Sequence, residues 1–235
     1  MKASFVKLMR YKFLILPIFF MCYINASELP PYKAKYNFES EEISITGIRE
    51  FKRSQDEYEI SFNASNLLAS LFFSSRFSVN NSIVMPKTYD IEITPKFLKR
   101  DQSLVFDRKE GLLKSKGQNS WVVKMTESNI VFDPLNVQIM IRIFIKKGLK
   151  EFDLNIVEME NGGSKKYTFK TKGYEKCLVG TTEYKCLILE RYRKDNERVV
   201  KYFLAEELEY MFVKIIDSSP VRTNKLELKE VLSFG

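Results

Sequence analysis

The chain has 235 residues, a length that suffices for one large or two small domains. Hydrophobic residues make up 45% and charged residues 29%, a composition that excludes a disordered protein. Its 38 basic and 30 acidic residues give a net charge of +8, without a long acidic or basic tail. Aromatic residues make up 14% and favour β-strands. Histidine is absent, which excludes Ser-His and Cys-His nucleophile pairs and His-ligated zinc but leaves carboxylate and Lys chemistry open.

The first 26 residues have the order of a secretory signal peptide. Four basic residues precede an apolar run from Phe13 to Ile24, and the small residue Ala26 marks the predicted cleavage point. The alternative is a membrane anchor, but a helix of this length spans only about 18 Å, which is shorter than a bilayer. Cys22 lacks the small residues that a lipid-attachment site places before its cysteine. We therefore expect a periplasmic protein, soluble after cleavage and tethered if the signal is uncleaved.

Export changes the charge and the cysteine content of the chain. Loss of residues 1–26 lowers the net charge to +4, which is too small to indicate binding to nucleic acid. It also removes Cys22 and leaves Cys177 and Cys186 as a pair in an oxidising compartment. No composition shift, repeat or linker divides the remainder, so we expect residues 27–235 to form a single domain.

Most of this domain alternates between apolar and polar residues with the period of two that is typical of strands with one wet face. Over 32–38, 43–51 and 58–64 the alternation predicts an antiparallel meander, whereas residues 65–77 fit a short helix or a strand equally well. Further strands are predicted at 89–94, 103–107, 112–115, 121–126, 152–159, 166–171, 199–205, 211–216 and 225–232, with a hairpin at 174–189. The spacing predicts a mainly β fold, a strongly curved antiparallel sheet or open barrel.

One apolar helix is predicted to lie within this sheet. Asp133 has the position of a helix N-cap, Pro134 that of the first helical residue, and Gly148 ends the run after two lysines. The β-branched residues of the segment leave a strand as the competing interpretation, but the boundaries favour a helix. Apolar residues fill two neighbouring rows: Leu135, Ile139 and Ile143, then Met140 and Phe144. So broad an apolar face predicts a helix that the sheet wraps around.

Cys177 and Cys186 flank a predicted turn at Gly180–Thr182. They are symmetric about the bond between Thr181 and Thr182, so a two-residue turn there would place them directly opposite each other. Opposed residues have Cα atoms about 4.5–5.5 Å apart, which a disulfide can span. Their spacing is not that of a CxxC redox motif, and we expect a structural disulfide.

Motifs that carry chemistry are mostly missing from the sequence. It contains no nucleophile elbow, P-loop, dinucleotide-binding glycine motif, calcium loop or Cys/His metal spacing, so we expect no cofactor and no metal. The acidic group Glu206–Glu209 is expected to be a solvated turn, because a glycosidase needs two carboxylates facing each other across a cleft. The basic segment Arg191–Arg198 is faintly like a nucleic-acid patch, but its acidic residues favour a hairpin tip.

Several short motifs follow one another in an order that resembles a known family. They are the strand Tyr32–Phe38, Asp133-Pro134-Leu135, Tyr167-x-Phe169, Gly173-Tyr174-Glu175, Tyr202–Ala205 and Met211–Ile215. Together they resemble the bacterial periplasmic family catalogued as domain of unknown function 3108, over roughly residues 32–232. The chain departs from the family in Phe203, where Trp is expected, in Phe212, where Pro is common, and in its hairpin cysteines.

This resemblance implies an architecture but no reaction. The family has no established activity, so no catalytic residue can be carried over. Its architecture is similar to that of periplasmic lipoprotein carriers, in which a strongly curved antiparallel sheet wraps around a helix and encloses an apolar cavity. A likeness at the level of the fold is a weak argument for function.

Two hypotheses of function follow. The favoured one is a non-enzymatic envelope protein that holds an apolar ligand, such as a lipid or acyl chain, in the curved sheet. The expected lining of its cavity is Tyr36, Phe62, Leu135, Ile139, Ile143 and Phe144. If the helix fills the cavity, the protein is instead a structural or interaction module that contacts other envelope proteins. The alternative is an envelope hydrolase that uses Asp133 or the Glu206–Glu209 group, which requires two carboxylates in one cleft and a raised pKa.

Overall fold

A computed structural model of the chain describes residues 29–41, 43–67, 69–94, 101–126, 129–193, 196–220 and 222–235. The predicted signal peptide, its cleavage point after Ala26 and Cys22 lie outside the described residues. Where the chain is described, it contains no helix with the length and apolar character needed to cross a membrane.

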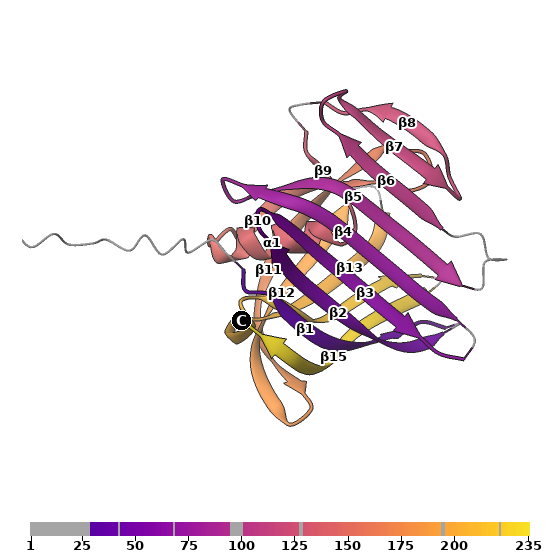
Figure 1. Cartoon of the computed structure of the whole chain (residues 1–235). Coiled ribbons are helices and arrows are strands. Elements are labelled where there is room, and N and C mark those ends of the chain that lie inside the picture. The colour runs from indigo at the N-terminus through magenta and orange to yellow at the C-terminus, as the bar shows by residue number, and fades with distance from the viewer. Residues whose placement is uncertain are drawn as a thin grey trace, which may run out of the picture.

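In the described part of the chain, fifteen strands form one strongly curved sheet (Figure 1). In chain order they are β1 (Tyr32–Glu39), β2 (Ser44–Ser54), β3 (Glu57–Ser65), β4 (Ser70–Asn80), β5 (Ile83–Thr94), β6 (Gln102–Asp107), β7 (Leu112–Gly117), β8 (Trp121–Lys124), β9 (Val131–Phe132), β10 (Glu151–Val157), β11 (Ser164–Val179), β12 (Thr182–Arg193), β13 (Asn196–Ala205), β14 (Met211–Ser219) and β15 (Arg222–Phe234). A mainly β fold with a curved antiparallel sheet is therefore confirmed.

The sheet consists of two meanders that meet at the ends of the chain. The order in space is β8-β7-β6-β5-β4-β3-β2-β1-β15-β14-β13-β12-β11-β10-β9. Neighbouring strands are antiparallel except β9 and β10, which are parallel. The first strand β1 pairs with the last strand β15, so the N-terminal and C-terminal meanders become one sheet through that ladder.

The period-two alternation becomes one buried face of the sheet. In β3, the inward residues Tyr58, Ile60 and Phe62 are buried, and their neighbours in sequence are more exposed. The segment that fits helix or strand equally well by pattern contains the start of β4. This segment is a strand, because β4 lies between β3 and β5 and its backbone groups form hydrogen bonds with both neighbouring strands.

Over the described residues the curved sheet does not close into a barrel, and side chains near its two ends connect them. Trp121 of β8 donates its indole N–H, at 3.1 Å, to the backbone oxygen of Met159, which follows the end of β10. The Gln102 amide of β6 reaches the same oxygen at 2.7 Å. Gly162 lies under the Trp121 ring with a φ of +78°, and a Cβ there would come within 2.7 Å of the ring atom Cζ3. This glycine therefore lets the two ends approach each other.

Helix α1 (Asn136–Lys146) lies inside the curve of the sheet, next to β4 and β5 (Figure 1). Its predicted start is wrong by two residues, because Pro134 and Leu135 form a turn and the helix begins at Asn136. Asp133 nevertheless satisfies the first backbone donors. Its Oδ1 accepts the N–H groups of Leu135 at 2.8 Å and Asn136 at 2.9 Å. The backbone turns out of the helix at Gly148, whose φ is +80°.

Cys177 and Cys186 are joined by a disulfide within the β11–β12 hairpin, which projects past the neighbouring strands as an orange arm in Figure 1. Their predicted register is wrong. The turn lies at Gly180–Thr181, because Val179 pairs with Thr182, and this shift places Cys177 opposite Tyr184. The disulfide therefore joins a diagonal pair, with Cα atoms 5.9 Å apart.

Candidate functional site

A pocket with a volume of about 380 Å³ opens on the concave face of the sheet, beside the N-terminal end of α1. This size is typical of sites for small molecules. Its lining comes from six strands and the start of the helix: Phe38, Arg49, Phe62, Leu71, Phe73, Pro134, Leu135, Gln138, Ile215, Asp217, Asn224, Lys225 and Leu226. We call it the concave pocket.

One wall of the concave pocket is a row of side chains across β2, β3 and β4. Arg49 stands opposite Phe62, which stands opposite Phe73. The two phenyl rings are stacked with centroids 6.5 Å apart. Gly47 makes room for this row, because a Cβ there would lie 2.7 Å from the Cζ atom of Phe62. Glycine at this inward position thus sets where the Phe62 ring lies.

The other wall is an apolar row across β1, β15 and β14. Leu226 stands opposite both Phe38 and Ile215. Leu135, in the turn before α1, adds a further apolar side chain to the lining. The walls are therefore made of aromatic and aliphatic groups, which favour an apolar occupant.

Arg49 brings a buried cation into this apolar lining. Its side chain points inward from β2, and the residue is only 2% exposed. Its Nη2 donates to Oε1 of Gln138 at 2.7 Å, and its guanidinium carbon lies 5.7 Å from the centre of the Tyr36 ring. Its Nε is buried without a hydrogen-bond partner. In the described part of the chain no carboxylate forms an ion pair with Arg49.

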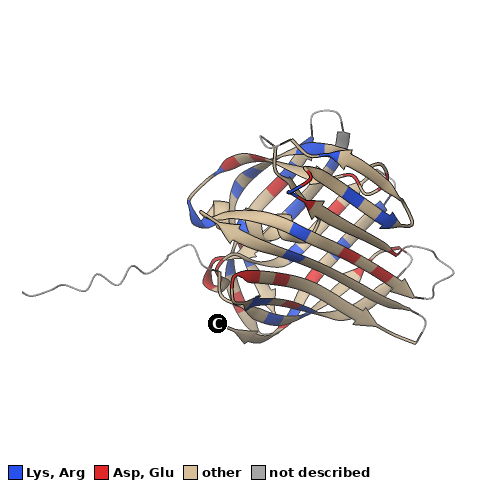
Figure 2. Cartoon of the chain, turned by 45° about the horizontal axis from the view of Figure 1, so that its top comes forward, with Lys and Arg blue, Asp and Glu red and all other residues tan. Residues whose placement is uncertain are grey.

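This lack of a carboxylate partner contrasts with the rest of the sheet. Acidic and basic residues mix along the strands (Figure 2). They form cross-strand pairs such as Lys52 with Glu59 at 3.2 Å and Lys170 with Glu151 at 2.9 Å. The sheet thus supplies acidic partners to many surface cations but not to the buried Arg49.

A second buried arginine lies on α1, outside the lining of the concave pocket. Arg142 is 1% exposed, and its Nε donates to the backbone oxygen of Glu209 at 3.1 Å. Its guanidinium carbon lies 5.4 Å from the centre of the Tyr32 ring, and its Nη1 has no partner. Burial lowers the pKa of this guanidinium. Arg142 ties the helix to the segment before β14, whereas Arg49 faces the concave pocket.

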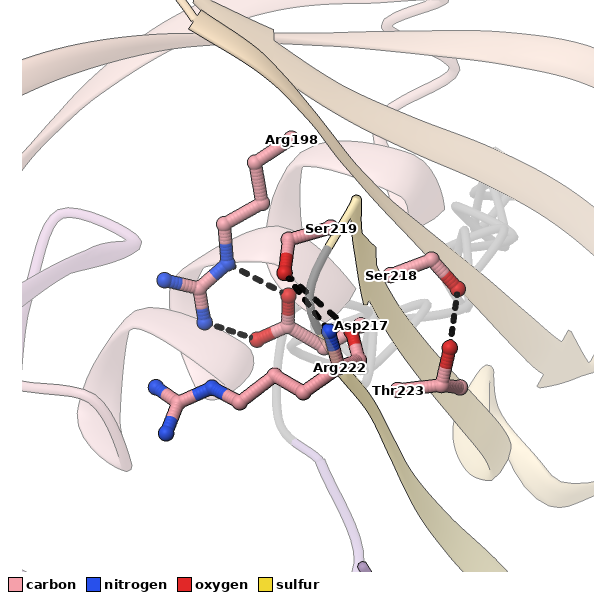
Figure 3. Close-up of polar contacts among 6 residues, drawn as sticks. All are labelled: Arg198, Asp217, Ser218, Ser219, Arg222 and Thr223. Carbon is pink, nitrogen blue, oxygen red and sulfur yellow. Dashed lines mark hydrogen bonds and ion pairs between the residues drawn. The ribbon is translucent and has the colours of Figure 1, made fainter. Parts of the chain in front are cut away.

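The mouth of the concave pocket is polar. Asn224, Lys225 and Asp217 line it, and all three are partly exposed. The carboxylate of Asp217 accepts two hydrogen bonds from Arg198, of which the one from Nε is 2.6 Å long (Figure 3). Lys225 pairs with Glu227 at 3.0 Å. The charges at the mouth are thus already paired, and Arg49 carries the unneutralised charge of the pocket.

The structure brings two of the predicted cavity residues, Phe62 and Leu135, to the concave pocket. The other four are elsewhere: Tyr36, Ile139 and Ile143 are buried in the core, and the Phe144 ring packs on Phe152 with centroids 5.0 Å apart. These four assignments are corrected, because α1 and the sheet pack these side chains into one hydrophobic core. The concave pocket lies beside the N-terminal end of the helix.

The two groups of candidate carboxylates do not converge. Asp133 is buried before α1, where it also accepts a hydrogen bond from Ser75 at 2.7 Å, and burial raises its pKa to about 7. Glu209 lies at the other end of the helix, paired with Lys146 at 2.7 Å, and Glu206 pairs with Lys185 at the surface. The described residues include no cluster of three or more Cys, Asp or Glu that could hold a metal ion.

Comparison with known proteins places the chain in a family. The family described as protein of unknown function (DUF3108) matches residues 31–229, which is most of the chain. The chain belongs to this family. No match to a curated protein was found.

A solved structure is similar to this member of DUF3108 in its fold. It is a beta-barrel-like protein of domain of unknown function DUF1849 from Brucella abortus, with a TM-score of 0.55 and 11% sequence identity. The similarity covers 87% of this chain and 98% of that one. At this identity the likeness concerns the fold alone, which agrees with the architecture expected from the lipoprotein-carrier resemblance.

Sequence reasoning did not single out Arg49 or Arg142, although both carry a readable signal. Arg49 occupies an inward position of an alternating strand, between Gly47 and Phe51. Arg142 stands within an otherwise apolar stretch of α1. A charged residue on a face that pattern assigns to the core is unusual, because burial of a charge is costly unless it is paired.

Proposed function

We propose that this protein is an exported, non-enzymatic component of the cell envelope that binds an apolar ligand, such as a lipid or acyl chain, in the concave pocket. The observation that carries the proposal is the pocket itself. It has apolar walls, a volume of about 380 Å³ and a polar mouth. A concave apolar surface with a few polar groups is the usual form of a small-molecule site.

Two features support export. The basic and apolar order of residues 1–26 is that of a signal peptide. The disulfide between Cys177 and Cys186 suits an oxidising compartment. Both features fit an envelope protein better than a cytosolic one.

A non-enzymatic role is favoured over a hydrolase by the positions of the carboxylates. Asp133 is enclosed by hydrogen bonds at the start of α1, and Glu206 and Glu209 are in surface ion pairs beyond its other end. Hydrolysis by two carboxylates requires both to reach one substrate bond, and these groups are separated by the length of the helix.

A pocket-filling variant tests the proposal. In L71W, a larger ring would occupy the concave pocket, whereas L232W makes the same change at a residue of β15 that is 45% exposed and outside the lining. We expect the wild type and L232W to bind a fluorescent fatty-acid analogue and L71W to bind it at least tenfold more weakly. Equal binding by all three proteins, or no binding by the wild type, would overturn the proposal.

A further inference from the structure

The concave pocket encloses a positive charge that no described residue neutralises. Arg49 is almost fully buried, it donates to the neutral Gln138 amide, and its Nε has no acceptor. A buried guanidinium without an anionic partner is strongly unfavourable, because it has lost water without gaining a counter-charge. An anion within the pocket would supply that counter-charge.

The acidic residue in the lining of the concave pocket, Asp217, already forms an ion pair. Asp217 lies at the mouth of the concave pocket and holds Arg198 through both of its carboxylate oxygens (Figure 3). The cation at the mouth, Lys225, is paired with Glu227. The groups that face the pocket thus leave one unpaired charge, on Arg49, at the end that is most deeply buried.

We propose that Arg49 binds the carboxylate of a fatty acid, with its single hydrocarbon chain lying between the two apolar walls of the concave pocket. This inference rests on the proposed function and adds the class of ligand and its orientation. The carboxylate meets the guanidinium at the inner end, and the chain passes Phe62 and Leu226 toward the mouth near Asn224.

The chemistry of both ends favours this ligand over other amphiphiles. A carboxylate carries one negative charge and two oxygens in a plane, which match a single planar guanidinium. A headgroup with more charge would leave the excess unpaired in an apolar site. A neutral alcohol or a cationic amphiphile would leave Arg49 without a counter-charge.

A comparison of two ligands with the same hydrocarbon chain tests the inference in the wild-type protein. Decanoate and decanol are titrated calorimetrically into delipidated mature protein at pH 8, where decanoate is ionised. We expect decanoate to bind at least tenfold more tightly than decanol. Equal affinities would overturn the role of Arg49 and leave the proposed function standing. If neither compound binds, the proposed function itself is wrong.

A pair of variants on one strand assigns the preference to Arg49. R49M replaces the inward guanidinium by an apolar side chain, and R53M makes the same change at an exposed position of β2. We expect R49M to lose at least tenfold in affinity for decanoate while its affinity for decanol stays within twofold of wild type, and R53M to change neither. A full decanoate preference in folded R49M would contradict the assignment. If R49M does not fold, the wild-type comparison still decides whether the concave pocket prefers the anionic ligand, and equal affinities there would overturn the role of Arg49.

Discussion

Two guanidinium groups, those of Arg49 and Arg142, lie in the interior of this protein with unpartnered nitrogens. Each lies near a tyrosine ring, and Arg142 also donates to a backbone carbonyl. Neutral contacts of this kind lower the cost of burial without supplying a counter-charge. Each of these two buried charges therefore lowers the stability of the folded state. Arg49 lines the concave pocket, whereas Arg142 does not.

Replacement of Arg49 should stabilise the protein when no ligand is bound. We expect delipidated R49M to unfold with a free energy about 1–3 kcal/mol higher than wild type, because a buried unneutralised charge is replaced by an apolar group. The control R53M should stay within about 0.5 kcal/mol. Urea denaturation measures both. A clear loss of stability in R49M would mean that the bond to Gln138 outweighs the cost of burying the charge.

Asp133 should make the stability of the protein depend on pH. Burial raises its pKa from 3.8 to about 7, so the folded state holds the proton more tightly than the unfolded state. The contribution to stability is then present at low pH and is lost as the pH rises from about 4 to about 7. We expect the stability of wild type relative to D133N to decline across that range in urea denaturation. A constant difference would contradict the raised pKa.

Among the secondary-structure elements, the two ends of the sheet are held together without a backbone ladder. The contact depends on the single tryptophan of the chain, Trp121, and on Gln102, which both donate to the backbone oxygen of Met159, and on Gly162. Position 162 requires glycine for two reasons: its φ is positive, and the Trp121 ring occupies the space that a Cβ atom would need. The β8 end of the sheet is thus positioned by a small set of side-chain contacts.

A comparison of alanine substitutions at Gly162 and Gly180 separates the backbone requirement from the steric one. Gly180, in the hairpin turn, also has a positive φ, of +58°, but an added Cβ there would meet open space. We expect the free energy of unfolding to fall by about 1–3 kcal/mol more in G162A than in G180A, because G162A adds a steric clash with the Trp121 ring to the backbone strain that both variants share. Trp121 fluorescence should shift to the red in G162A alone. Equal losses in the two variants would show that the ring contact contributes little.

For the molecule as a whole, the sequence carries the local pattern better than the long-range pairing. Alternation in segments such as Tyr58–Ala64 predicts strands, and Asp133 and Gly148 bracket the helix to within a few residues. The pairing of β1 with β15 leaves no local signal, since it joins the two ends of the chain. The register of the disulfide hairpin also cannot be predicted from the sequence, because Gly180-Thr181 and Thr181-Thr182 can both form a two-residue turn.

The concave pocket shows the same limit at the level of the site. Period-two patterning identifies Tyr36 and Phe62 as inward residues but does not say which of them the helix covers. The structure buries Tyr36, whose hydroxyl donates to the backbone oxygen of Phe212 at 2.6 Å, and leaves Phe62 at the pocket. That difference depends on where α1 begins relative to the sheet, which is a property of the assembled fold.

The central claim, that the concave pocket holds an apolar ligand, is tested most directly by the intact mass of the mature protein purified from the periplasm. The mass is measured under non-denaturing and then denaturing conditions. We predict a denatured mass that lacks residues 1–26 and two hydrogens, and additional native mass that extracts into organic solvent. A native mass equal to the denatured mass, with no uptake of added decanoate, would contradict ligand binding and favour an interaction module whose interior is filled by α1.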